Sequence, residues 1–316
     1  MPAVDFEEKE FETLANASLL AGAPAGVKIF SPGQVLEATL GFDFSMALSP
    51  SSKAAQILRR SFPTPIGVSP TAAAASGLPP QVSGMFLNVF LQYKRPTHFR
   101  VGHRSPLWPI GEEFLRFDAV QRKRIGGTAI VSFDQVEAMA DLESQFGVQA
   151  QVSYVCAGFA TRDALYSHFA AGTLLAHSTF VEPRRLRLGA GFHSYWTYQS
   201  GDLSFGQPNP GGPRDTAKNG LDFFSDMRAT NLPTSSLDEF THNSSLAAAR
   251  ARQGDSWKRR RGRERSFEES EEERRSEAVE EIRRVFGASD AQRIAQTIET
   301  AAVARTLDLE WMIIEA

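Results

Sequence analysis

The sequence has little of several features that would point to a particular class of protein. It contains a single cysteine, Cys156, and its 34 lysines and arginines are outnumbered by 37 aspartates and glutamates. One cysteine excludes a disulfide within the chain, so we expect a protein of the reducing cytoplasm, and the apolar neighbours of Cys156 predict a buried core residue instead of a nucleophile. A net charge of −3 excludes the strongly basic surface of many dedicated DNA-binding proteins, so any DNA contact must be local.

Long apolar runs are missing as well. No stretch of about 18 apolar residues occurs, and the acidic amino-terminal segment lacks the basic start of a signal peptide, so we expect neither a membrane protein nor a secreted one. The sequence has no Walker-type glycine-rich loop and no serine nucleophile elbow. These absences argue against an ATPase and against a serine hydrolase.

What the sequence does contain is a succession of helical and strand-like patterns. Apolar residues at helical spacing predict a helix over residues 5–20, and strict alternation over 35–48 predicts a strand with one buried and one polar face. The run 85–94 is apolar on both faces, which is typical of a central strand. We further predict helices over 133–146 and 161–172, strands over 148–159 and 307–314, and short strands and turns over 189–212. The predicted fold class is α/β.

Three polar residues on the first two predicted strands form a candidate site. Gln92 and Lys94 are two residues apart and therefore share one face of their strand, and Asp43 lies on the polar face of the other strand. Oxygen ligands hold Mg²⁺, and a cationic group can steady the attacking water and the transition state of phosphodiester hydrolysis. This pair of predicted strands can supply both functions, and the geometry allows the three side chains to converge.

These residues carry a resemblance to a known superfamily. Gly41-Phe42-Asp43, followed by Gln92-Tyr93-Lys94-Arg95, resembles the GxD…QxKR form of the PD-(D/E)xK motif, as in Mrr-type restriction endonucleases and relatives of Holliday-junction resolvases. The glutamate-bearing helix that opens the family is similar to the segment around residues 11–15. The resemblance covers roughly residues 6–160, and it implies a restriction-endonuclease-like mixed sheet flanked by helices.

The resemblance also implies roles for individual residues. Asp43 would be the principal ligand of Mg²⁺, for which Mn²⁺ may substitute in such sites, and the side-chain oxygen of Gln92 and the backbone carbonyl of Tyr93 would complete the protein ligands. Lys94 would orient or activate the attacking water. Glutamine replaces the usual acidic residue at position 92, which lowers the negative charge of the site.

The glutamate of the opening helix has two candidates. The resemblance assigns to Glu12 a contact with a metal-bound water, and Glu8, one helical turn earlier, is a rival for that role. A long insertion, residues 49–84, separates the two motif strands, and a loop of that length is usually functional or disordered.

Basic residues that follow the motif are candidates for DNA binding. Arg95, Arg100 and Arg104, together with His98 and His103, form a local basic cluster that would hold DNA phosphates next to the site. A solvated loop would have the same composition, so this alternative stays open.

Other notable residues receive a structural interpretation. Three scattered histidines and three clustered aromatic residues are expected to pack, without forming a zinc site and in preference to stacking on bases: His168, His177, His193, Tyr195, Trp196 and Tyr198. The basic run 258–265 is followed by acidic residues, which predicts a solvated helix.

These features give three predicted regions: a nuclease-like core over 1–160, an α+β continuation over 161–245, and a charged, mainly helical extension over 246–316. We expect a metal-dependent DNA endonuclease of restriction or anti-phage defence, acting as a homo-oligomer or with a partner protein. The alternatives are an inactive member of the same fold that binds DNA or a partner subunit, and an interaction protein whose carboxy-terminal helices dock to an oligomer.

Overall fold

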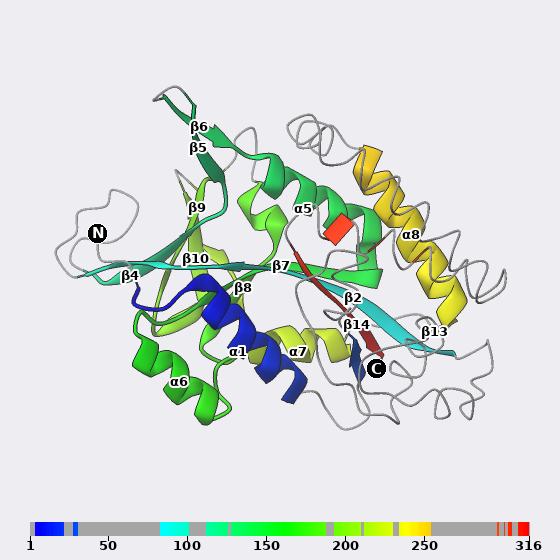
Figure 1. The fold of residues 1–316 in the computed structure, drawn as a ribbon, viewed down its shortest axis with the longest axis horizontal. Helices are drawn as coiled ribbons and strands as arrows, with labels where there is room; N and C mark the ends of the chain where they lie inside the picture. The colour runs from blue at the N-terminus through cyan, green and yellow to red at the C-terminus, as the bar shows by residue number, and fades with distance from the viewer. Residues whose placement is uncertain are drawn as a thin grey trace. The chain divides into compact units, whose positions relative to one another are not determined.

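The computed structural model describes the start of the predicted core, residues 4–21, and most of residues 83–160, but little of the region between them. The described residues are 4–21, 28–30, 83–100, 112–125, 128–187, 193–209, 212–229, 234–253, 296, 300, 303–304 and 309–315. Over these residues the chain is of mixed α/β content, with helices beside mixed and antiparallel sheets (Figure 1). None of the helices found there has the length and apolarity required to cross a membrane.

The chain forms two compact units, each built from separate segments. Unit 1 consists of residues 1–23, 91–143 and 152–231, and unit 2 consists of residues 24–90, 144–151 and 232–316. Because both units draw on early and late parts of the sequence, the contacts do not follow chain order. The boundaries predicted at 160/161 and 245/246 remain predictions.

Several predicted elements are confirmed, and most of their observed ends lie within two residues of the predicted ends. They are α1 (Glu8–Ala21), β2 (Ser83–Lys94), α5 (Asp134–Phe146), β7 (Ala150–Ala157), α6 (Arg162–Ala170) and β14 (Glu310–Glu315). The predicted strand over 35–48, the basic run 258–265 and residues 49–82 of the insertion predicted over 49–84 lie outside the described residues, whereas Ser83 and Gly84 begin β2.

Unit 1 contains a five-stranded antiparallel sheet that only partly follows the predicted elements. Its order is β11 (Asp215–Thr216), β10 (Asp202–Asn209), β9 (Tyr195–Gln199), β4 (Phe114–Asp118) and β3 (Thr97–Phe99). A separate antiparallel hairpin joins β5 (Gln121–Ile125) to β6 (Thr128–Ser132). The strands β9 and β10 confirm the short strands expected over 189–212.

A further group of paired strands in unit 1 includes the end of β2. Strand β7 lies next to β2 and pairs with β8 (Ser178–Val181), which in turn pairs with β12 (Lys218–Asn219). The turn η2 (Pro183–Leu186) follows β8, and α7 (Gly220–Ala229) follows β12. Residues Leu87 to Tyr93 of β2 are all buried, as expected for a central strand.

Aromatic residues fill the core of unit 1 between these sheets. Trp196 and Tyr198 are fully buried, and the ring of Phe117 lies 5.6 Å from that of Tyr154 and 6.4 Å from that of Tyr198. The packing roles predicted for Trp196 and Tyr198 are confirmed. Cys156 is also fully buried and free, as predicted.

Helix α6 shows how local sequence sets the ends of an element. The hydroxyl of Thr161 accepts a hydrogen bond from the backbone N–H of Ala164 at 3.2 Å, which caps the start of the helix. After its end, Gly172 has a φ of 67°, a left-handed conformation that glycine adopts without steric cost. Helix α1 lies beside α6 (Figure 1), and Glu10 pairs with Arg162 at 3.1 Å.

Unit 2 contains β1 (Lys28–Phe30), β14, the first part of β2 and β13 (Thr234–Ser236), with α8 (Leu237–Gln253) and η1 (Gly147–Gln149). The ring of Phe90 packs on Phe146 and Trp311. The buried side chain of Asn88 donates to the hydroxyl of Ser244 at 2.9 Å and accepts from the indole of Trp311 at 3.0 Å. A buried amide with both functions satisfied fixes the packing of this unit.

Candidate functional site

The candidate site lies where strand β2 ends in unit 1. Successive side chains of a strand point to opposite faces, so Gln92 and Lys94 share one face and Tyr93 points to the other. The Tyr93 hydroxyl donates to Asn16 of α1 at 2.5 Å, and its ring packs edge-on against Phe11 at 5.9 Å. Helix α1 therefore covers the Tyr93 face of the strand (Figure 1).

The opposite face of β2 meets the first turn of α5. Gln135 of α5 donates its side-chain amide to the side-chain oxygen of Gln92, and its own oxygen accepts from the ammonium of Lys94 at 3.3 Å. Gln92 in turn donates to the backbone carbonyl of Tyr93 at 3.3 Å. Gln92 and Gln135 are only 4% and 2% exposed, so these groups interact away from bulk water. We call the chain from Lys94 through Gln135 and Gln92 to the Tyr93 carbonyl the amide relay.

The ammonium of Lys94 fixes the direction of the amide relay. An ammonium group only donates, so it must face the oxygen of Gln135 and not the nitrogen. The nitrogen of Gln135 is then left to face Gln92, which must present its oxygen. One charged group thus orients two amides whose atoms would otherwise be interchangeable.

Further contacts hold Lys94 in place. Its ammonium lies 5.8 Å from the centre of the Tyr154 ring, within the range of a cation–π contact. Its backbone carbonyl accepts from the thiol of Cys156 at 3.0 Å. Burial raises the pKa of that thiol far above its ordinary value, so Cys156 stays protonated and serves as a donor.

The two glutamates considered for the opening helix lie in different surroundings. Glu8 accepts from the backbone N–H of Arg95, the residue after Lys94, at 2.9 Å. Glu12 accepts from Lys9 at 2.7 Å on the same helix. The contact of Glu8 with Arg95 therefore lies next to the motif, whereas the contact of Glu12 with Lys9 lies within α1. The role of either glutamate stays a prediction.

The basic residues predicted to bind DNA have separate positions. The guanidinium of Arg95 pairs with Glu7 at 3.0 Å and donates to the backbone carbonyl of Val4 at 2.6 Å, so it ties down the segment before α1. Arg100 is exposed after the end of β3. Arg104 lies outside the described residues, and DNA binding by the three arginines stays a prediction.

The described oxygen atoms of the candidate site meet only part of the requirements of a Mg²⁺ site. The side-chain oxygen of Gln92 and the carbonyl of Tyr93 are the hard oxygen ligands that Mg²⁺ accepts. Within the parts of the chain that the structure describes, no three histidine, cysteine or acidic side chains gather as a metal site. The carboxylate predicted to carry the charge is that of Asp43, which lies outside the described residues.

Two histidines form a pair on unit 1. The rings of His168 and His177 stack with centres 3.8 Å apart, and the Phe159 ring lies 5.2 Å from His168. Burial and the nearby His177 lower the pKa of His168, which favours the neutral ring. His168 is half-buried, in agreement with the predicted packing role, whereas His177 is exposed.

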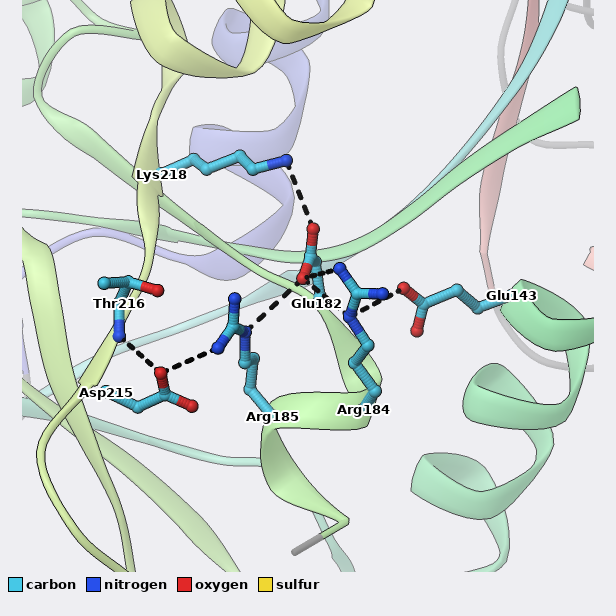
Figure 2. A network of polar contacts seen from close by, with 7 residues as sticks. All are labelled: Glu143, Glu182, Arg184, Arg185, Asp215, Thr216 and Lys218. Atoms are coloured by element: carbon cyan, nitrogen blue, oxygen red, sulfur yellow. Dashed lines mark hydrogen bonds and ion pairs between the residues drawn. The ribbon is translucent and has the colours of Figure 1, made fainter. Parts of the chain in front are cut away.

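A second polar cluster was not predicted from the sequence. Glu182 accepts from Arg184 at 2.7 Å and pairs with Lys218 at 3.1 Å and with Arg185 at 3.4 Å. Arg185 also pairs with Asp215 at 2.7 Å. Figure 2 shows the side chains converging around η2, and we call them the ion-pair cluster.

Glu182, inside the ion-pair cluster, and Glu143, beside it, have pKa values shifted in opposite directions. Burial raises the pKa of Glu182, but hydrogen bonds from Arg184 and the charge of Lys218 outweigh burial and lower it below the ordinary value. Glu143, 3.5 Å from Arg184, has a pKa raised by burial. Because cations and carboxylates pair within the cluster, its charges are used to hold η2 against neighbouring elements.

Comparison of the chain with protein-family models, curated proteins and solved structures finds no match. The proposal for its function therefore rests on the geometry of the site and on the resemblance of residues 41–43 and 92–95 to the PD-(D/E)xK motif.

The residue that the sequence did not reveal is Gln135. It is 43 residues from Gln92 in the sequence, and glutamine is common on helix surfaces. One feature of the sequence could have indicated that Gln135 is buried. It precedes Val136, the first apolar residue of the predicted helix.

Proposed function

We propose that the end of β2 is the active site of a Mg²⁺-dependent DNA endonuclease with a restriction-endonuclease-like fold. The observation that carries the proposal is the amide relay, because it gathers an oxygen donor, Gln92, and a cation, Lys94, on one face of a buried strand end. A phosphodiester hydrolase needs both functions within a few ångströms of the phosphate.

The proposed roles follow from the chemistry of each group. Gln92, the Tyr93 carbonyl and Asp43 would hold the divalent cation, which supplies Lewis-acid activation of the phosphodiester. Lys94 would orient the attacking water and stabilise the charge that develops on the phosphate. Burial of the relay strengthens these interactions, since they act in a medium of low dielectric constant.

The choice of DNA and a role in restriction or anti-phage defence rest on the resemblance of the motif. Arg100 and Arg104 would contact phosphates beside the site, in keeping with a chain whose overall charge is not basic. Nucleases of this fold generally use two active sites to cut both strands of a duplex, so we propose a homo-oligomer or a complex with a partner protein.

The experiment is a nicking assay on supercoiled plasmid with Mg²⁺, Mn²⁺ or EDTA. Wild type is compared with Asp43→Ala and Lys94→Ala, and Arg214→Ala serves as control because Arg214 is an exposed cation paired with Asp202 at 3.2 Å. We expect metal-dependent nicking that both site variants lose and the control retains. Equal nicking by wild type and both site variants would refute the site.

A second candidate function is a non-catalytic subunit of the same fold that binds DNA or a partner. The observation in its favour is the neutral Gln92, whose oxygen already accepts from Gln135. Plasmid binding in a gel-shift assay, without nicking under any metal condition, would support this candidate against the nuclease.

A further inference from the structure

The hairpin of β5 and β6 is a two-stranded ribbon of unit 1. Its strands pair in register from Gln121 with Ser132 to Ile125 with Thr128, and neither pairs with a third strand among the described residues. Figure 1 shows the hairpin running outward from the end of β4 and the start of α5. Because β5 and β6 pair only with each other, the hairpin is an extension of unit 1 and not a part of its sheets.

The charge of the hairpin differs from that of the whole chain. Strand β5 contains Arg122, Lys123 and Arg124, and no aspartate or glutamate occurs between residues 119 and 133, in a chain of net charge −3. Successive residues of a strand belong to opposite faces, so Arg122 and Arg124 share one face and Lys123 lies on the other. Basic residues therefore occur on both faces of the hairpin, and we call residues 121–125 and 128–132 the basic arm.

The strand that pairs with the basic residues brings no acid to them. The register sets Val131 opposite Arg122, and apolar residues of β6 likewise stand opposite the other two basic residues. In a sheet that is only structural, opposite charges across strands would stabilise such residues. The register of the basic arm offers no such pair, and Val131 is 38% exposed. The arm thus combines basic and apolar residues without a partner strand for either edge among the described residues.

The basic arm is rooted beside the candidate site. At the end of β6, the hydroxyl of Ser132 donates to the carboxylate of Asp134 at 2.8 Å. Asp134 begins α5, and the next residue, Gln135, accepts a hydrogen bond from Lys94 at the end of β2. The arm therefore starts within a few residues of the strand end at which we propose that DNA is cut.

Duplex DNA fits the dimensions and the charge of such an arm. The major groove of B-DNA is about 12 Å wide and admits a two-stranded ribbon. An antiparallel strand rises about 3.4 Å per residue, so the five residues of β5 extend about 17 Å. The duplex carries one negative charge for about every 1.7 Å of its axis, so phosphates are available along the whole arm.

We propose that the basic arm binds the phosphate backbone of duplex DNA, an inference whose choice of DNA rests on the proposed function. Arg122, Lys123 and Arg124 contact phosphates, and the root of the arm directs the bound duplex to the end of β2. Phosphate contacts of this kind position a duplex and carry no direct sequence information. This binding requires neither a metal ion nor cleavage.

Two triple variants test the basic arm. The arm variant replaces the basic residues of β5: Arg122→Gln, Lys123→Gln and Arg124→Gln. The control variant removes the same charge from the same unit at arginines whose side chains are 63%, 48% and 61% exposed and pair with acidic residues: Arg184→Gln, Arg187→Gln and Arg214→Gln. A charge-preserving variant combines Arg122→Lys with Arg124→Lys.

The measurement is the fluorescence anisotropy of a labelled DNA duplex in EDTA, repeated between about 50 and 200 mM salt. Each phosphate contact contributes about 0.9 to the slope of log K against log salt, so the arm variant should lose about 2.7 from that slope. We expect it to bind roughly 10- to 100-fold more weakly at the lowest salt. The charge-preserving and control variants should keep the affinity and the slope of wild type.

Circular dichroism and gel filtration report the folding and the size of each variant. If the arm variant does not fold, Lys123→Gln replaces it, with an expected change of about 0.9 in the slope. Charged residues can also keep an unpaired strand from pairing with another copy of the chain. An arm variant that self-associates but binds DNA as wild type does would overturn the proposal. An equal loss of affinity in the control variant would also overturn it, because net charge alone would then explain the effect.

Binding in EDTA separates this inference from the proposed function. Duplex binding that the arm variant loses, without nicking by wild type in any metal, would support the basic arm and refute the nuclease. Nicking that Lys94→Ala abolishes, with unchanged duplex binding by the folded arm variant, would support the nuclease and overturn the role of the arm. A loss confined to single-stranded DNA, measured in parallel, would overturn the choice of a duplex.

Discussion

The two polar networks of unit 1 differ in how they use charge. The ion-pair cluster around Glu182 sets arginines and lysine against carboxylates, and Arg184 keeps 63% of its side chain exposed (Figure 2). The amide relay is built from buried neutral amides that lead from one ammonium, Lys94, to a carbonyl. The ion-pair cluster sets its charges against one another and so holds η2 in place, whereas the contacts described for the Lys94 ammonium are with a neutral amide and an aromatic ring.

The largest expected effect comes from exchanging one lysine in each network. We predict that Lys94→Met lowers metal-dependent nicking by about 100-fold or more, because the amide relay loses the charge that acts on the phosphate. Lys218→Met should leave nicking unchanged and lower stability instead, since Lys218 pairs with the largely buried Glu182 at 3.1 Å.

Plasmid nicking and urea unfolding of the same samples test this crossed pattern. If Lys218→Met lost nicking as strongly as Lys94→Met while remaining folded, the two networks would not differ in the way we describe.

The next effect concerns the stability of the ion-pair cluster. Glu182→Gln removes the carboxylate that joins Arg184, Arg185 and Lys218, and we predict a loss of about 2 kcal/mol in the free energy of unfolding at neutral pH. The pKa of Glu182 is lowered in the folded state, so its contribution is present above the ordinary value of 4.5 and is lost as the pH falls below it.

Urea unfolding at pH 7 and in steps below pH 4.5 measures both statements. The difference between wild type and Glu182→Gln should shrink as the pH falls. Arg184→Ala is the internal reference, with an expected cost below about 1 kcal/mol because its side chain is mostly solvated. A difference that stays constant to low pH would contradict the assigned charge of Glu182.

The smallest effect tests the neutral character of the amide relay. Gln92→Glu places a carboxylate where the superfamily motif usually has one, and carboxylates bind Mg²⁺ more strongly than amides do. We predict that half-maximal nicking occurs at about tenfold lower Mg²⁺, and that Mg²⁺ raises the melting temperature of the variant more than that of wild type.

The control for this substitution is Gln207→Glu. Gln207 is a glutamine of the same unit, and its amide donates to the backbone carbonyl of Gly212 at 2.8 Å. A melting temperature of Gln92→Glu that does not respond to Mg²⁺ would argue against a cation at this strand end.

The fold was predictable where the pattern of apolar residues is local. The helix α1 and the strand β2 follow from periodicity alone, and α5, β7 and α6 agree with their predicted ranges. The strands between residues 97 and 132 were not predicted. The segment Gln121–Ile125, for example, is mostly polar and charged, so its strand form depends on pairing with β6 and not on its own pattern.

The candidate site was predictable to the same extent. Alternation placed Gln92 and Lys94 on one face, and their shared contact with Gln135 agrees with that placement. It did not reveal that Arg95 binds Glu7 or that Glu8 lies beside the motif. Such pairings join residues more than 80 positions apart, and no local pattern records them.

The sequence by itself determined the period of each element, the burial of Cys156 and the common face of Gln92 and Lys94, because these depend on neighbours along the chain. Tertiary structure alone decided which side chain meets that face. Gln135 reaches Gln92 and Lys94 only because α5 starts at the end of β6 and docks against β2. Hydrogen-bond partners are set by packing between distant segments, so the amide relay emerges only once the chain is folded.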